Sequence, residues 1–309
     1  MPQNRKMAGR GFIKTLTSDP VFGYLLVLPI LLWVIATVGY PLISAIYTSF
    51  TNLGFLGASA DFIGIRNYAR VFQDTRFWSA FSRSIVWTLS NALLQTILGF
   101  MTALILNQRF KGQGFARMWI ILSWIVPTVV VAIIWRWVLS GTFGVLNYIL
   151  ENFGLVSDPI NFLGSIKYAM VTLIGINSWR WFPFLSIIIL ATLQTIPEDQ
   201  YEAADIDGAG ALQKFLYITF PFLKPTLTVL GLIGTLWSIN VFDIIWMLTQ
   251  GGPSGVTTTL PVYIYEKGFK AFAMGEAATA SAIMFIFLVV FSLLYVRINK
   301  MGKEEAAWW

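Results

Sequence analysis

The sequence is poor in side chains that catalyse covalent chemistry. It contains no Cys and no His among its 309 residues. Disulfides, thiolate nucleophiles, zinc or haem ligation and His-based acid–base triads are therefore excluded. The phosphate-loop pattern G-x-x-x-x-G-K-[ST] is also absent, so we expect no ATP hydrolysis by this chain. We predict that the chain is not an enzyme, with no catalytic residue, no metal ligand and no bound cofactor.

Polar side chains inside apolar segments are the groups best placed to hold a ligand. Two segments carry them: Asn177 and Trp179 in one, and Trp237, Ser238 and Asn240 in the other. Counted at about 1.5 Å per residue from Lys167 and Thr249, these side chains lie within a few Å of one depth. Such groups are costly in an apolar phase and mark ligand paths by default. Hydrogen bonding to a neighbouring helix is the competing interpretation for each.

A second polar set repeats along one apolar segment at steps of three and four residues. It comprises Ser84, Thr88, Asn91, Gln95, Gly99 and Thr102. This spacing puts the set on one face of a helix. We count Asn91 and Gln95 as candidates for a ligand path, and helix–helix hydrogen bonding remains the alternative.

Arg180 is a charge in the middle of an apolar segment and needs a partner or water. Asp243 is the one acid clearly inside a later apolar segment, but it lies about seven residues shallower, or about 10 Å. We therefore favour a water-filled cavity beside Arg180 over a direct pair with Asp243. Arg136, between Trp135 and Trp137, is typical of an anchor at a membrane surface.

The composition places these segments in a lipid bilayer. Hydrophobic residues make up 57% and charged residues 12%, about half of the roughly 25% charged residues in soluble domains. Apolar runs of about 20 residues span a bilayer as helices. The predicted fold is an all-α membrane protein with six transmembrane helices, at about 22–50, 81–106, 118–139, 167–193, 226–249 and 273–296. They form a transmembrane domain over 20–298, between an N-terminal segment 1–19 and a tail 299–309.

The distribution of Lys and Arg sets the orientation. The termini, the loop 107–117 and the insert 194–225 hold twelve of them, and the opposite loops hold six, or seven with Arg83. The richer side is the cytoplasm, which predicts an N-in, C-in arrangement. The net charge of +6 follows from this bias and does not indicate nucleic-acid binding.

The insert 194–225 is a charged segment between two apolar ones. Thr195, followed by Pro197 and Glu198, is typical of a helix start with a Thr cap. Gly208 then permits a left-handed turn, so that the chain can reverse into a second short helix. On physical grounds alone, a solvated loop and an element that docks a soluble partner are equally favoured.

This insert resembles the E-A-A…G…I-x-L-P loop of binding-protein-dependent ABC importer permeases. The matching residues are Glu202, Ala203, Ala204, Asp207, Gly208, Ala209, Phe215, Ile218, Pro221 and Pro225, with Phe220 where the pattern usually has Leu. Further segments are similar to the carbohydrate-uptake branch, of the maltose and glycerol-3-phosphate permease type; they are Phe242-Asp243, Leu248–Pro253, Tyr263–Phe272 and Met274-Gly275. The resemblance covers roughly 20–300.

The resemblance implies the permease subunit of an ATP-driven sugar importer in the cytoplasmic (inner) membrane of a prokaryote. Implied partners are a second, related permease chain, two cytoplasmic ATPase subunits that hold ATP and Mg, and an extracytoplasmic substrate-binding protein. A coupling helix near Gln200–Ala209 would seat in the ATPase through Glu202, Ala203, Ala204, Asp207 and Gly208. The positions of Asn177 and Trp179 resemble sugar-contacting positions of the maltose branch, and Ser238 lies on the corresponding fifth-span stretch.

Other functions remain as alternatives. The same importer class also carries glycerol-3-phosphate and polyols, and the sequence does not choose among these substrates. A self-sufficient secondary transporter is disfavoured by the cytoplasmic insert and by the absence of an obvious internal repeat. A membrane enzyme is disfavoured by the lack of His and Cys.

Overall fold

A computed structural model of the protein describes residues 19–54 and 60–306. In this part of the chain the regular structure is helical, apart from one isolated bridge between Thr51 and Phe62. The predicted N-terminal segment lies, except for Asp19, outside the described residues. The all-α prediction is confirmed for the part of the chain that is described.

Five helical stretches are long and apolar enough to cross a membrane: Leu26–Ser49, Thr75–Asn107, Ala169–Leu193, Ala211–Ile239 and Met274–Asn299. The first consists of α2 (Asp19–Val34), the π-helical turn η1 (Ile35–Gly39) and α3 (Tyr40–Ser49). The others are α5 (Thr75–Asn107), α9 (Ala169–Leu193), the run of α11 (Ala211–Lys214), η2 (Phe215–Thr219) and α12 (Phe220–Ile239), and α15 (Met274–Ala306).

The third predicted span, 118–139, is not one continuous helix. It is divided into α6 (Gln113–Ile125) and α7 (Thr128–Val138), which meet at an angle of 96°. Pro127 lies in the break, and a proline disfavours helical geometry in the residue before it. The described chain therefore has six crossings only if this bent pair counts as one of them.

The fifth predicted span, 226–249, is wrong at both ends. The helix already begins before Pro221 and Pro225 and passes through both. The π-helical turn η2 ends at Thr219, close to Pro221, and local π-helical geometry helps a membrane helix to accommodate a proline. It ends at Ile239, and a separate helix, α13 (Asp243–Thr249), follows after a break. The fifth crossing is thus interrupted near its predicted outer third.

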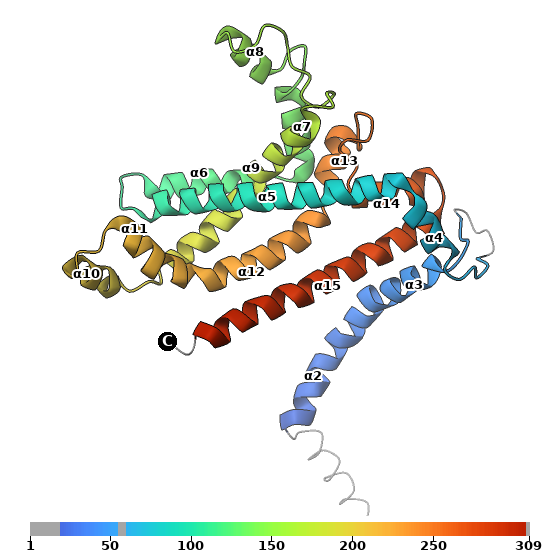
Figure 1. Cartoon of the computed structure of the whole chain (residues 1–309), viewed down its shortest axis with the longest axis horizontal. Coiled ribbons are helices and arrows are strands. Elements are labelled where there is room, and N and C mark those ends of the chain that lie inside the picture. Colours follow the sequence, from blue (N-terminus) through green and yellow to red (C-terminus); the bar gives the residue numbers. More distant parts are fainter. Residues whose placement is uncertain (1–18, 55–59, 307–309) are drawn as a thin grey trace, which may run out of the picture.

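Short helices connect these elements. They are α4 (Arg66–Gln73), α8 (Val145–Asn152), α10 (Glu198–Ile206), α14 (Leu260–Tyr265) and the π-helical turn η3 (Glu266–Lys270). In Figure 1, α10 and the end of α15 lie at one end of the molecule, and α4 and α14 lie at the other. The segment with α8 projects away from the bundle, and α2 diverges from it.

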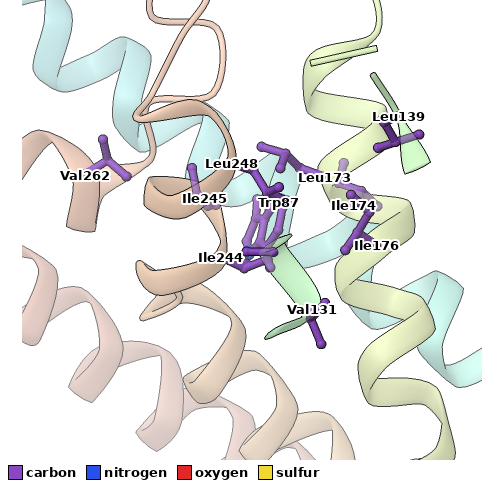
Figure 2. Packing of buried hydrophobic residues seen from close by; sticks show 11 residues of the cluster. Trp87, Val131, Leu139, Leu173, Ile174, Ile176, Ile244, Ile245, Leu248 and Val262 are labelled. Carbon is purple, nitrogen blue, oxygen red and sulfur yellow. The ribbon is translucent and has the colours of Figure 1, made fainter. Parts of the chain in front are cut away.

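The pair formed by α5 and α9 is the centre of the bundle, and α12 packs on both helices. Gly99 of α5 allows the close approach, since a Cβ at this position would lie 3.0 Å from Cβ of Leu185 and 3.2 Å from the carbonyl oxygen of Phe182. Trp87, also on α5, is buried among apolar residues of α9 and α13, and Figure 2 shows its ring between Ile244 and Leu173. These contacts fix the positions of α9 and α12 relative to α5.

Candidate functional site

A hollow of about 90 Å³ lies between α5, α9 and α12. Its lining comprises Gln95, Asn177, Trp181, Phe184, Leu185, Leu230, Ile233, Gly234, Trp237, Ser238 and Val241. Four of these residues, namely Gln95, Asn177, Trp237 and Ser238, are among the ligand-path candidates predicted from the sequence. The structure therefore brings together side chains that lie more than 140 positions apart in the chain.

Helical spacing explains which side chains face the hollow. On α9 the lining residues Asn177, Trp181 and Phe184 follow steps of four and three, which puts them on one face. Leu230, Gly234 and Trp237 repeat the same steps on α12. Sequence reasoning missed Trp181 and Phe184, although their spacing from Asn177 was a usable signal.

Three aromatic rings form one wall of the hollow. Trp237 lies 5.7 Å from Trp181 and 5.8 Å from Phe184, measured between ring centroids, and the last two rings meet edge to face at 6.2 Å. Ring faces of this kind bind the apolar C–H surface of a ligand. Trp237 is half exposed, so one face remains available.

A cluster of buried polar side chains adjoins the hollow. The Oδ1 atom of Asn91 accepts hydrogen bonds from Nδ2 of Asn177 at 2.7 Å, from Nε2 of Gln95 at 3.1 Å and from Oγ of Ser178 at 3.2 Å. Asn91 itself is fully buried and does not line the hollow. Its bonds with Asn177 and Ser178 of α9 are the helix–helix hydrogen bonds that the sequence left open as the alternative, whereas Gln95 lies on α5 itself.

Two buried polar atoms at the hollow lack any hydrogen-bond partner. They are Oδ1 of Asn177 and Oγ of Ser238. Unsatisfied buried groups of this kind cost free energy and need an explanation, and both residues line the hollow. The arrangement can therefore bind a molecule that carries hydroxyls on an apolar frame.

Trp179 and Asn240, two other predicted path residues, do not line this hollow. Trp179 faces away, 39% exposed, and contacts Trp135 edge to face. Asn240 lies in the break after α12, where its amide donates to the carbonyl of Leu236 in the preceding turn. The depth of Asn240 was counted from Thr249 along one continuous helix. The break between α12 and α13 makes that count invalid.

Arg180 also lies outside the hollow. Its guanidinium is 5.5 Å from the ring centroid of Trp181, and its Nε atom is buried without a partner. The described part of the chain contains no ion pair between Arg180 and Asp243, so the structure does not bear out the alternative of a direct pair. The favoured cavity beside Arg180 is not this hollow either, since Arg180 does not line it. Arg136, expected to be a surface anchor, donates a hydrogen bond to the carbonyl of Met247 and so joins α7 to α13.

The predicted coupling segment forms a helix and a turn at one end of the molecule (Figure 1). Helix α10 spans Glu198–Ile206, and Gly208 adopts a φ of +73°. The predicted cap is wrong, because Thr195 donates its hydroxyl to the carbonyl of Thr192 instead of capping α10. Glu202, Ala203, Asp207 and Gly208 are exposed and Ala204 is half-buried. Ile206, which sequence reasoning did not select, is 87% exposed beside them.

An ionic cluster lies at the opposite end of α5. Nζ of Lys267 contacts Asp74 at 3.1 Å and Glu276 at 2.9 Å, and the Tyr263 hydroxyl donates to Asp74 at 2.8 Å. Burial disfavours the charged form of Asp74, but the hydrogen bonds from Tyr263 and Lys267 outweigh it and lower the pKa of Asp74 below its ordinary 3.8. Burial and the bond to Asp74 raise the pKa of Tyr263. No group of three acidic residues spaced to hold a metal ion occurs among the described residues.

Curated relatives resemble the chain over most of its length. The trehalose/maltose transport system permease protein MalF of Thermococcus litoralis is 34% identical over 91% of this chain and 95% of its own. The sulfoquinovosyl glycerol transport system permease protein SmoG of Agrobacterium fabrum is 32% identical, covering 91% of each chain. The inner membrane ABC transporter permease protein YcjO of Escherichia coli is 30% identical over 97% of this chain and all of its own.

A solved structure shares the fold. A chain of a bacterial ABC transporter for import of the acidic polysaccharide alginate superposes with a TM-score of 0.83 and 25% identity, over 94% of this chain and 98% of that one. The family model described as "Binding-protein-dependent transport system inner membrane component" matches residues 95–301. The chain therefore belongs to this family and is a multi-pass permease of the inner membrane.

Proposed function

We propose that the chain is the membrane-spanning subunit of an ATP-driven importer for a neutral sugar. The observation that carries the proposal is the pair of unpartnered buried atoms, Oδ1 of Asn177 and Oγ of Ser238, beside the aromatic wall. Sugars offer hydroxyls for such atoms and C–H faces for such rings. Relatives named for trehalose, maltose and diacetylchitobiose uptake support a sugar substrate. The neighbour for the acidic polysaccharide alginate does not decide its charge, so the neutral assignment rests on the hollow.

The lining of the hollow supports a neutral sugar over glycerol-3-phosphate. None of the residues that line it is charged in the part of the chain described. A phosphate taken out of water needs a cation or several donors, and Arg180 lies against Trp181 outside the lining. An uncharged, hydroxylated substrate fits this hollow better than an anionic one.

The hollow forms only part of a complete substrate path. Its volume holds about three water molecules, so a disaccharide requires further space. We infer that a second, related permease chain supplies the opposite wall, and that an extracytoplasmic binding protein delivers the sugar. A related alginate transporter has been solved with a substrate-bound periplasmic protein, which supports the second partner.

The coupling segment supplies the link to two ATPase subunits in this proposal. In an N-in orientation α10 lies in the cytoplasm, with Glu202 and Ile206 exposed. The Tyr201 hydroxyl contacts Oγ1 of Thr219 at 2.9 Å, and Ile196 shares a buried cluster with Leu223 of α12. A displacement of α10 is therefore passed to α12, which lines the hollow.

The test is sugar uptake by cells that carry the whole transporter, with labelled maltose, trehalose and diacetylchitobiose. We expect Glu202→Lys to lower uptake at least about tenfold, which corresponds to about 1.4 kcal/mol. Asp199→Lys makes the same charge change on an exposed residue of α10 and serves as the control. Normal uptake with Glu202→Lys would contradict docking through α10, and no uptake of any sugar by the wild type would contradict the substrate class.

A further inference from the structure

We propose that Asn91 is a positioning residue that fixes the polarity of the sugar site. It holds the side-chain amide of Asn177 so that only the carbonyl oxygen faces the hollow. The site then accepts a hydrogen bond from a sugar hydroxyl at this point and does not donate one. This inference rests on the proposed function and adds a rule for which hydroxyl pattern the permease takes.

The orientation of the Asn91 amide is set by the backbone. Its Nδ2 atom donates to the carbonyl of Trp87 at 2.9 Å. A backbone carbonyl can only accept a hydrogen bond, so the nitrogen of Asn91 must point toward Trp87. Its Oδ1 atom therefore points the other way, toward α9.

The orientation of Asn177 follows from that of Asn91. The Oδ1 atom of Asn91 lies 2.7 Å from Nδ2 of Asn177, and an amide oxygen can only accept. A flipped Asn177 would place two carbonyl oxygens at this distance, which is repulsive. Gln95 and Ser178 also donate to Oδ1 of Asn91, so three donors hold this acceptor in place. Asn177 accordingly turns Oδ1, the unpartnered atom, away from Asn91.

The same turn of α5 also fixes the second polar atom of the site. The indole Nε1–H of Trp87 donates to the backbone carbonyl of Ser238 at 3.0 Å. Ser238 lines the hollow, and its buried hydroxyl has no partner; a hydroxyl can donate or accept. Asn91 thus orients the acceptor of Asn177 on α9, and Trp87, one turn away, holds the backbone of Ser238 on α12. Together they set the spacing between the two polar groups.

The consequence is selectivity for one sugar hydroxyl that acts as a donor. A site built to hydrogen-bond a substrate hydroxyl strongly rejects an analogue without it, because the buried partner is left unpaired. A fluorine atom accepts weakly and cannot donate. A monodeoxyfluoro sugar should therefore be rejected at the position that contacts Asn177, and accepted more readily once Asn177 can turn its NH₂ group to the hollow.

The experiment measures uptake by the whole transporter of the parent sugar that the wild type takes up and of its monodeoxyfluoro derivatives. The binding protein is identical in all variants, so its own selectivity cancels when ratios are compared. With Asn91→Leu we expect the ratio of parent to fluoro-sugar uptake to fall at least about fivefold at one ring position only. Asn91→Asp, whose neutral acid can donate to Trp87 and accept from Asn177, should keep the wild-type ratio.

The controls separate positioning from general damage. Ser178→Ala leaves two donors on Asn91 and should not change any ratio. If Asn91→Leu does not assemble, Asn91→Ser, which is too short to reach Asn177, takes its place. Equal loss at every ring position, or no change in any ratio, would overturn the inference while the proposed function stands. Failure of the wild type to take up any sugar would overturn the proposed function, and the inference with it.

Discussion

Two polar clusters join α5 to later helices, and they differ in charge. The amide cluster of Asn91, Gln95, Asn177 and Ser178 is neutral and buried. The ionic cluster of Asp74, Tyr263, Lys267 and Glu276 lies at the start of α5 and keeps about a fifth of each charged side chain exposed. The amide cluster leaves one acceptor open, whereas the ionic cluster pairs its charges with one another.

The difference follows from the cost of removing each group from water. A buried charge without a partner costs far more than a buried amide, so charges are kept where water still reaches them. The amide cluster can leave Oδ1 of Asn177 unsatisfied at a moderate cost. The comparison teaches that the polar contact in the interior is built from neutral groups, and the structural tie at the edge from ions.

Removing the cation of the ionic cluster should have the largest effect on stability. Lys267→Met leaves Asp74 and Glu276 without their shared partner, and we expect a loss of about 1–3 kcal/mol in the free energy of unfolding. The measurement is the thermal unfolding midpoint of the purified protein in detergent. Lys270→Met is the matched control, since its half-exposed amine pairs with Glu266 at 3.7 Å, and about 0–1 kcal/mol is expected. Equal losses in the two variants would contradict the role assigned to the ionic cluster.

Acidification should weaken the ionic cluster and leave the amide cluster unchanged. The pKa of Asp74 is lowered in the folded protein, so its stabilisation is complete above the ordinary value of 3.8 and is lost as the pH falls below that value. The raised pKa of Lys267 acts in the opposite range, with stability lost only above the ordinary 10.5. On going from neutral pH to a pH below 3.8, we expect the thermal unfolding midpoint of Asp74→Asn to fall less than that of the wild type. The fall in the wild type should be smaller than the change caused by Lys267→Met. Parallel pH curves of the two proteins would refute this assignment.

The smallest effect is expected inside the amide cluster. Ser178→Ala removes one of three donors to Asn91 and buries no unpaired group in exchange. We expect a loss of about 0.5–1 kcal/mol in the free energy of unfolding, independent of pH, in the same thermal assay. A loss as large as that of Lys267→Met would contradict the smaller contribution to stability assigned to the amide cluster.

Sequence patterns were sufficient for the features that depend on local periodicity. Apolar length located five helical crossings, and the polar stripe of α5 predicted a face on which Asn91, Gln95 and Gly99 are all buried. Motif spacing located the helix before Gly208. Features that depend on where the backbone breaks were not predicted. The break at Pro127 has a local signal, the proline itself, which the span prediction did not use. The break after Ile239 has no proline or glycine between Ile239 and Asp243 to mark it, and it invalidated the depth assigned to Asn240.

The separate chemistry of the two clusters could not be predicted either. Asn91 and Asn177 look equivalent in the sequence, and only the hydrogen bond to the Trp87 carbonyl shows that one orients the other. Asp74 and Lys267 lie far apart in the chain and share no pattern. Contacts of this kind come from the packing of helices that sequence periodicity does not pair.

The length of α5 has a consequence for where the ionic cluster and the amide cluster lie in the membrane. A helix of 33 residues is about 50 Å long at about 1.5 Å per residue, and the hydrocarbon layer is only about 30 Å thick. Asp74 precedes Asn91 by 17 residues, or about 25 Å along the axis. With Asn91 at the bilayer centre and little tilt, Asp74 lies about 10 Å beyond the hydrocarbon boundary. With that placement, one helix would hold the ionic cluster at the level of the lipid headgroups and the amide cluster at mid-membrane.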